Sequence, residues 1–159
     1  MGSAFSYIYI KGQTESEILE TLALSTEEDS EDREIVGVPI TENSYLVVDI
    51  NMTLPTMPER LLDLSKNNIV LSGGFTETCP SSRISAWSNG KEIWRVEYDE
   101  SDGLYIGGTP PESANQILAS VDSEMWAPVL LFKTLTGISP ESIGSFISSG
   151  STLRPKNLD

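Results

Sequence analysis

Carboxylates are the side chains most able to do chemistry in this sequence of 159 residues, which contains 24 Asp and Glu residues and no histidine. Without histidine, the chain cannot form a Ser-His-Asp or Cys-His nucleophile or an H-E-x-x-H zinc site. It also loses most general acid-base chemistry near neutral pH. The single cysteine, Cys79, has no histidine to activate it as a nucleophile. What remains is a pair of carboxylates of the kind that glycosidases use.

The candidates for such a pair lie on or beside predicted strands. They are Asp49, Glu77, Glu92, Glu97 and Asp99. With 24 acidic residues in the chain, some pair of this kind is expected by chance and is weak evidence for catalysis. The G-x-S-x-G, P-loop and G-x-G-x-x-G motifs are also missing. We therefore predict a protein that is not an enzyme and that carries no cofactor, with a carboxylate-dependent hydrolase as a distant alternative.

Net charge is the strongest global signal, because ten basic residues leave a formal charge of −14. Such a surface repels nucleic acid and anionic membranes and attracts basic proteins by electrostatic steering. Acidity that only keeps the protein soluble explains the composition equally well. If the charge does serve recognition, we expect a protein partner with a basic binding surface, whose Arg and Lys would pair with carboxylates of this chain.

Acidic residues are densest at residues 27–34, EEDSEDRE, which we call the acidic loop. Its spacing lacks the alternating ligands, central glycine and final glutamate of a calcium loop, so we predict no metal site. A second acidic group follows a predicted strand near residue 99. The predicted partner-binding residues are Glu27, Glu28, Asp29, Glu31, Asp32, Glu97, Asp99, Glu100 and Asp102.

The element that should position the second group is residues 83–108, which the pattern predicts to be a three-stranded antiparallel meander. Asn89-Gly90 suits a type I′ hairpin turn, and Asp102-Gly103 marks a second turn. With Asn89 and Gly90 at the centre of the first turn, Ser85 should face Trp94 across the hairpin. One face should then be buried and contain Trp87, Trp94, Val96 and Tyr98. The other face should be only partly covered and contain Ile84, Ala86, Ile93, Arg95 and Glu97.

Periodicity and turn signals predict the remaining elements. Strands are expected at residues 5–11, 35–40, 45–50 and 69–78, with a bulge or a close backbone approach at Gly73-Gly74. Helices are expected after a capping box at residues 14–17, before residue 67 with Leu61, Leu62 and Leu64 buried, and at residues 112–121, 125–135 and 140–147. The tail, residues 148–159, should fray. Together these predict one α+β domain over residues 1–159, with a mostly antiparallel sheet of about six or seven strands and helices mainly on one face.

Targeting signals are not evident in the sequence. The first residues lack the basic and apolar regions of a signal peptide, and no apolar run reaches the length of a membrane span. One cysteine allows no intramolecular disulfide. We therefore expect a cytoplasmic protein without membrane contact.

Three segments carry a resemblance: AWSNGKEIWRVEYD at residues 86–99, GLYIGGTPP at 103–111 and WAPVLLFKTLTGI at 126–138. They resemble segments of small uncharacterised bacterial proteins, some of which are similar to immunity proteins encoded beside secreted antibacterial toxins. The resemblance implies a cytoplasmic protein that binds and neutralises one cognate toxin. The acidity of the chain makes a nuclease one candidate for that toxin, because carboxylates can replace phosphates in a basic cleft. An adaptor or scaffold domain is the alternative from another functional class.

Overall fold

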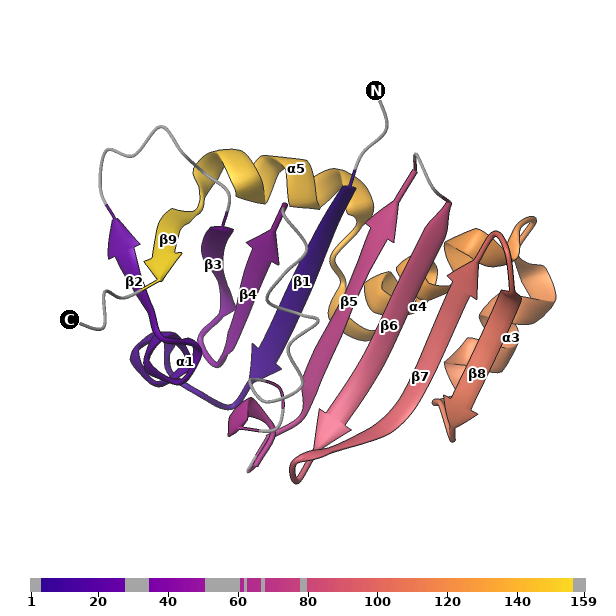
Figure 1. Cartoon of the computed structure of the whole chain (residues 1–159), viewed down its shortest axis with the longest axis horizontal. Coiled ribbons are helices and arrows are strands. Elements are labelled where there is room, and N and C mark those ends of the chain that lie inside the picture. The colour runs from indigo at the N-terminus through magenta and orange to yellow at the C-terminus, as the bar shows by residue number, and fades with distance from the viewer. Residues whose placement is uncertain are drawn as a thin grey trace.

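The computed structural model describes residues 4–27, 35–50, 61, 63–66, 68–77 and 80–155. Its strands are β1 (Ala4–Lys11), β2 (Leu24–Glu27), β3 (Ile35–Thr41), β4 (Ser44–Asp49), β5 (Val70–Thr76), β6 (Ser81–Ser88), β7 (Lys91–Asp99), β8 (Gly103–Gly108) and β9 (Ser151–Pro155). They form one sheet of nine strands in the order β2-β9-β3-β4-β1-β5-β6-β7-β8 (Figure 1). All the strand pairs are antiparallel. The predicted α+β class with a mostly antiparallel sheet is confirmed.

The helices begin at the predicted signals. They are α1 (Glu15–Leu22), α3 (Glu112–Ser120), α4 (Ala127–Thr136) and α5 (Pro140–Ser149), with a short 3₁₀ turn, η2 (Glu124–Trp126), before α4. The Thr14 hydroxyl accepts a hydrogen bond from the Glu17 amide at 3.2 Å, as the capping box predicted. Ser139 caps α5 in the same way, and Gly137 ends α4 in the left-handed conformation.

Two cores lie on opposite faces of the sheet. On one face, α3, α4 and α5 cover a cluster that includes Tyr7, Val48 and Ile84. On the other face, which we call the α1 face, α1 packs over Ile8 and Val47. Helices therefore lie mainly on one face, as predicted, but the expectation that the N-terminal helix joins the C-terminal ones is wrong. Because β1 and β4 are buried from both sides, most of their residues are apolar on both faces.

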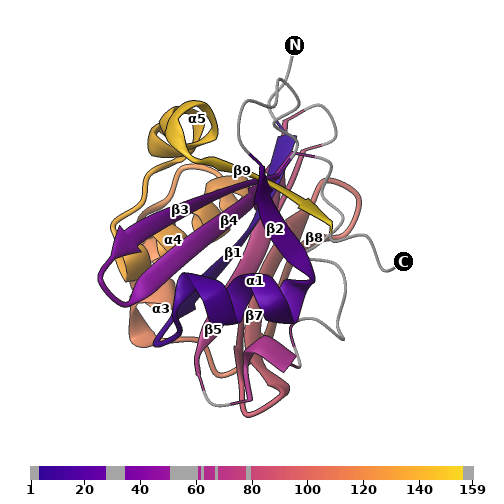
Figure 2. The same cartoon turned by 90° about the vertical axis from the view of Figure 1, so that its left-hand side faces the viewer.

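The described part of the tail that was expected to fray is ordered: it completes α5 and continues into the sheet, whereas residues 156–159 lie outside the described residues. Residues 151–155 form β9, which lies between β2 and β3, and Thr152 and Leu153 are buried there. Figure 2 shows β9 beside β2 at that end of the sheet. The sequence predicted neither strand because each is short and depends on pairing with the other. Helix α1 ends at Leu22, because Ala23 takes a left-handed conformation with φ 56°.

The structure describes the helix before residue 67 in part and the glycine pair of β5 in full. Leu61 and Leu64 are helical and buried, whereas Leu62 and Cys79 lie outside the described residues. At Gly73 the close approach is confirmed, because an added Cβ would lie 2.1 Å from the Arg83 carbonyl oxygen. The pairing of β5 with β1 and β6 is regular at Gly73-Gly74, so the alternative of a bulge there is wrong.

Candidate partner-binding surface

The meander of β6, β7 and β8 is present, but a bulge changes which residues share a face. Asn89 and Gly90 have φ of 53° and 76°, as a type I′ turn requires. Trp87 pairs with Glu92, yet the next pair is Ala86 with Trp94, so Ile93 is an extra residue in β7. Ser85 consequently pairs with Arg95, and the predicted pairing of Ser85 with Trp94 is wrong.

This bulge moves Trp87 to the opposite face from Trp94. Trp94 and Val96 are buried under the C-terminal helices together with Ile84 and Ala86, which were expected on the exposed side. Trp87 instead packs at the end of the core on the α1 face. A bulge of one residue reverses the alternation of a strand, and hairpin turn chemistry alone does not show it.

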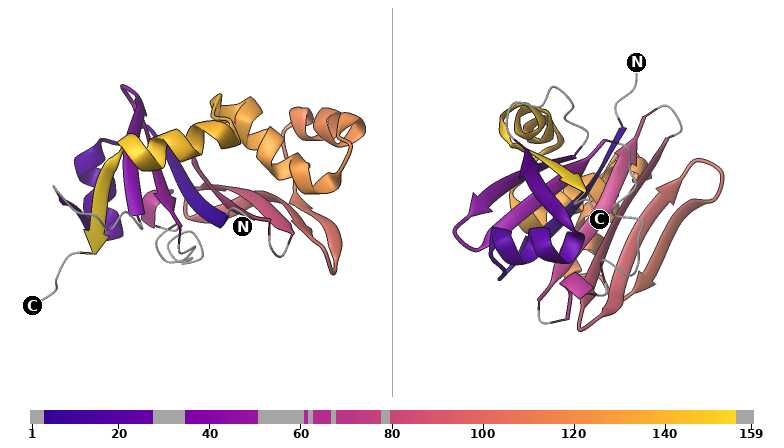
Figure 3. Two further views of the ribbon diagram at one scale, coloured as in Figure 1. Left: turned by 90° about the horizontal axis from the view of Figure 1, so that it is seen from above. Right: turned by 60° about the vertical axis from the view of Figure 1, so that its left-hand side comes forward.

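The open face of the meander is the part of the α1 face on β7 and β8 that carries Glu92, Arg95, Glu97 and Tyr105. Figure 3 shows α3, α4 and α5 on one side of the sheet. Among the described residues no helix lies over β7 and β8 on the other side, although the helical residues Leu61 and Leu64 share a core with Trp87 of β6. Arg95 lies 3.6 Å from Glu92 and 3.9 Å from Glu97, and its guanidinium lies 5.0 Å from the Tyr105 ring centroid. Contacts with Tyr105 and the two carboxylates raise the pKa of Arg95 although its burial opposes this. The open face is therefore polar and accessible to a partner, and its charged side chains form ion pairs with one another.

The acidic turn is residues 99–102, between β7 and β8. Asp99 Oδ1 accepts hydrogen bonds from the amides of Ser101 at 2.7 Å and Asp102 at 3.4 Å, so Asp99 shapes the turn. Glu100 and Asp102 are exposed, and among the described residues neither side chain has an ion pair. Of the predicted binding residues on the meander, Glu100 and Asp102 are thus available to a partner, whereas Glu97 and Asp99 already have internal partners.

The structure does not bring Glu27 together with the acidic turn. Glu27 is the last residue of the edge strand β2, and Glu28, Asp29, Glu31 and Asp32 lie outside the described residues. Strands β2 and β7 are separated by β9, β3, β4, β1, β5 and β6. With neighbouring strands about 4.8 Å apart, Glu27 and the acidic turn are on the order of 30 Å from each other.

A polar concavity of about 250 Å³ lies beside the acidic turn and contains two of the candidate carboxylates, Glu97 and Asp99, together with Arg83. Retaining and inverting glycosidases use two carboxyl groups that face each other across the scissile bond. Here Glu97 lies beside the Arg95 guanidinium, and Asp99 accepts two amide hydrogen bonds within the acidic turn. Both candidate carboxylates therefore already contact other groups of this chain.

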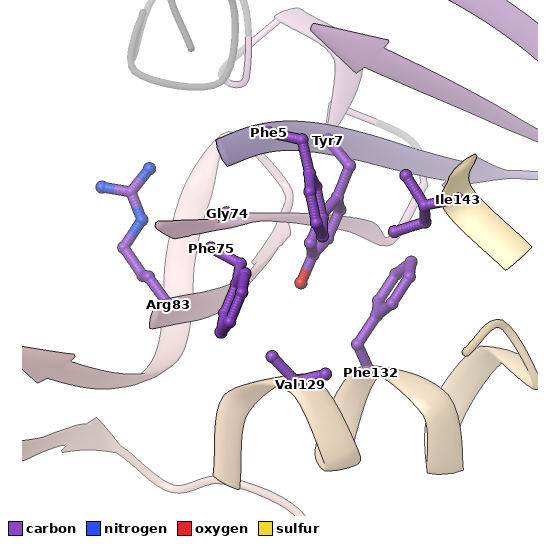
Figure 4. Close-up of a pocket in the computed structure, with 8 residues that line it drawn as sticks. All are labelled: Phe5, Tyr7, Gly74, Phe75, Arg83, Val129, Phe132 and Ile143. Carbon is purple, nitrogen blue, oxygen red and sulfur yellow. The ribbon is translucent and has the colours of Figure 1, made fainter. Parts of the chain in front are cut away.

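A second cavity, between the sheet and α4, is apolar and enclosed (Figure 4). The hydroxyl of Tyr7 points into it between Phe75, Val129 and Phe132, and Arg83 points away. Burial raises the pKa of Tyr7, whereas the charge of Arg83 acts in the opposite direction. The volume of this cavity is about 10 Å³, which is roughly the space needed to hold one water molecule and is too small for a substrate.

An apolar groove of about 290 Å³ lies at the far end of β7 from the acidic turn. Ile69, Ile93 and Leu135 line it and are exposed by 58%, 43% and 39%, with Trp94 at its base. The groove was not predicted, because Ile69 comes from the segment just before β5, Ile93 from the bulge and Leu135 from α4. The bulge leaves Ile93 outside both cores, which is the physical reason that the groove is apolar and open.

Sequence reasoning also missed Tyr105 and Ile106 as surface residues of an edge strand. The sequence does contain a signal for an edge strand, because Pro110-Pro111 follows this strand closely. Proline has no backbone N–H to donate to a neighbouring strand, so it is typical of sheet edges.

No other chemistry is apparent in the described ranges. Among them, no group of three His, Cys, Asp or Glu side chains could hold a metal ion. The described helices include none with the length and apolar character to cross a membrane. The chain matched no protein family, no curated protein and no solved structure when it was compared with them.

Proposed function

We propose that this chain is an inhibitor that binds one basic protein, and that the partner is a cognate bacterial toxin, with a nuclease as one candidate. The observation that carries the proposal is the acidic turn. Its Glu100 and Asp102 are exposed and have no ion pair among the described residues, and the turn borders an uncovered sheet face. Carboxylates in this state can pair with Arg and Lys of a partner without first breaking an internal contact.

Electrostatics supports a basic partner in particular. The formal charge of −14 attracts a basic surface at long range and repels nucleic acid, so a nucleic-acid enzyme with a basic cleft is a suitable target. The resemblance of residues 86–99, 103–111 and 126–138 to bacterial immunity proteins supports a toxin as that target.

The distance between Glu27 and the acidic turn limits how one partner can bind. A standard interface covers about 800 Å² on each protein, which is roughly 30 Å across. A partner centred on the acidic turn therefore need not reach Glu27, so we test the two acidic groups with separate variants.

The test is capture of partners from a lysate of the source organism on the immobilised chain, washed in low and then high salt, with identification by mass spectrometry. We expect one stoichiometric partner whose toxicity, on expression in bacteria, is suppressed by coexpression of this chain. Many weak partners lost in salt would favour the adaptor, and a captured partner that is not toxic would contradict the inhibitor.

Charge reversal then identifies which acidic group acts. The variant E100K/D102K changes the acidic turn, and a second variant reverses Glu28, Asp29, Glu31 and Asp32 in the acidic loop. As a control, E20K/E42K makes the same charge change as the first variant at exposed positions of the N-terminal half. We expect E100K/D102K to slow association and flatten its salt dependence more than the control does. Equal kinetics for the two would remove the acidic turn from the interface.

A carboxylate-dependent hydrolase has one observation in its favour, the concavity that holds Glu97 and Asp99. It predicts turnover of chromogenic glycosides that is abolished by E97Q or D99N. The inhibitor predicts no turnover by the unmodified chain, so a positive assay would replace the proposal.

A further inference from the structure

The edge strand β8 has the features of a strand that accepts another strand. It pairs with β7 on one side, and among the described residues no backbone hydrogen bond reaches its other side. An edge of this kind presents unpaired N–H and C=O groups along its length. With six residues, β8 is about 20 Å long, enough for several backbone hydrogen bonds to a partner.

Proteins usually protect such edges with charged residues, proline, bulges or short length. Strand β8, GLYIGG, has no charged residue and no proline, and its pairing with β7 is regular. The opposite edge, β2, is only four residues long and ends in Glu27. The two edges thus differ in protection, and β8 is the more exposed to pairing.

Side chains of β8 leave its backbone accessible. Tyr105 lies along the open face over Gly107, where an added Cβ would meet its ring and hydroxyl at about 3 Å. Ile106 points to the opposite face and is 45% exposed. Neither side chain is charged. An incoming strand would therefore meet no charge repulsion from them, and no charged group would have to lose its water.

The surroundings of β8 define the chemistry of that strand. Its beginning, Gly103, follows the acidic turn, whereas its end, Gly108, pairs with Trp94 next to exposed Ile93. An antiparallel strand on β8 would place its carboxyl end at the acidic turn and its amino end beside the apolar bulge. Charge complementarity therefore requires basic residues at the carboxyl end of the strand.

We propose that β8 binds its partner by strand addition: an extended segment of the partner pairs antiparallel with residues 103–108, with Lys or Arg at its carboxyl end facing Glu100 and Asp102. This inference rests on the proposed function, that the chain acts by binding a basic protein, and specifies how. A second copy of the chain is a poor occupant, because two chains of charge −14 repel each other. In strand addition, main-chain hydrogen bonds supply affinity and side chains supply specificity. Binding of this kind uses the edge of β8 and does not depend on a helix over the open face.

A peptide probe tests this directly. The probe has about nine residues, alternating valine and threonine, with two lysines at its carboxyl end and blocked termini. It is titrated into the full-length ¹⁵N-labelled chain at low salt. We expect amide shifts and slowed hydrogen exchange at residues 103–108, together with shifts at the acidic turn.

The matched control is the same peptide with alternate backbone amides N-methylated, which keeps its charge but cannot pair as a strand on that edge. We expect roughly tenfold weaker binding, because several backbone hydrogen bonds are lost at once. Equal binding of both peptides, with shifts only at residues 99–102, would overturn strand addition while leaving an acidic docking surface. Shifts at β2 instead of β8, or no shift at β8 at millimolar peptide, would also overturn it, whatever partner the capture experiment finds.

A variant supplies independent evidence. Ile106→Lys puts a lysine on the exposed edge and should weaken binding of the unmethylated peptide several-fold, because lysine protects edges. Leu130→Lys adds the same charge at an exposed position of α4, away from β8, and should leave binding unchanged. Circular dichroism of both variants establishes that they are folded. Equal affinities for the two folded variants would contradict the proposal.

Discussion

The two halves of the sheet are built differently. Strands β1 and β4 are covered on both faces, by α1 on one and by the C-terminal helices on the other, and every residue of β4 is buried. Strands β7 and β8 are covered only by the C-terminal helices, and their other face carries Arg95, Glu97 and Tyr105. The closed half has both of its faces buried, whereas the open half leaves a face, an edge and an acidic turn exposed.

Removing a buried side chain from the closed half should have the largest effect. Ile8, in β1, is fully buried on the α1 face. Ile8→Ala should reduce the free energy of unfolding by roughly 2–5 kcal/mol through lost transfer energy and a residual cavity. Ile93→Ala, at a side chain 43% exposed on the meander, should cost less than about 1 kcal/mol. Urea denaturation measures the free energy of unfolding of both variants. Equal losses would contradict the difference in burial between the two halves.

Within the open half, the end of β8 packs closely against the bulge in β7. Comparison of two glycine substitutions tests this contact. Gly108 has φ +67°, and an added Cβ would lie 2.2 Å from the Ile93 carbonyl oxygen. Gly108→Ala should cost about 1–3 kcal/mol beyond the matched Gly103→Ala, which has φ +78° and nothing within 4 Å. Thermal or urea unfolding gives the difference. If the two variants are equally stable, the end of β8 is not in close contact with the bulge.

Alkaline pH should weaken the closed half through its two buried tyrosines. Burial raises the pKa of Tyr7, and burial together with the nearby Glu15 carboxylate raises the pKa of Tyr45. The native state therefore retains protons that the unfolded state releases above pH about 10, so these groups contribute stability below that pH and lose it as pH rises. The loss is about 1.4 kcal/mol per pH unit for each tyrosine until the native pKa is reached. Unfolding curves at several alkaline pH values measure this slope.

Phenylalanine variants identify the groups responsible. Tyr7→Phe and Tyr45→Phe should each make the alkaline slope shallower, and the double variant should have the shallowest slope. The Tyr45 hydroxyl is buried without a hydrogen-bond partner among the described residues, so Tyr45→Phe should not reduce stability at neutral pH by more than a few tenths of a kcal/mol. An unchanged slope in the double variant would refute this origin of alkaline sensitivity.

The smallest effect is expected on the open face. Arg95→Met removes two partly exposed ion pairs and the contact with Tyr105, and should cost less than about 1 kcal/mol at low salt and less again at high salt. Lys133→Met, at an exposed position of α4, is the matched control. Urea denaturation in low and high salt gives both values. A loss as large as that of Ile8→Ala would mean that the open face is part of the core.

Local chemistry was readable from the sequence wherever the determining residues are close together in the chain. The capping box at Thr14 and the Asn89-Gly90 turn each depend on a few neighbouring residues, and each is confirmed. The acidic turn was also predicted from Glu97 to Asp102, although the hydrogen bonds that engage Asp99 were not.

What tertiary structure decided depends on residues far apart in the chain. Strands β2 and β9 exist because residues 24–27 and 151–155 pair with each other, which no local pattern reveals. The bulge at Ile93 placed Trp87 and Trp94 on opposite faces and opened the apolar groove, because one extra residue reverses strand alternation. The sequence by itself determined the elements, the acidity and the missing histidine chemistry. Only long-range pairing decided which face, which edge and which carboxylates remain available to a partner.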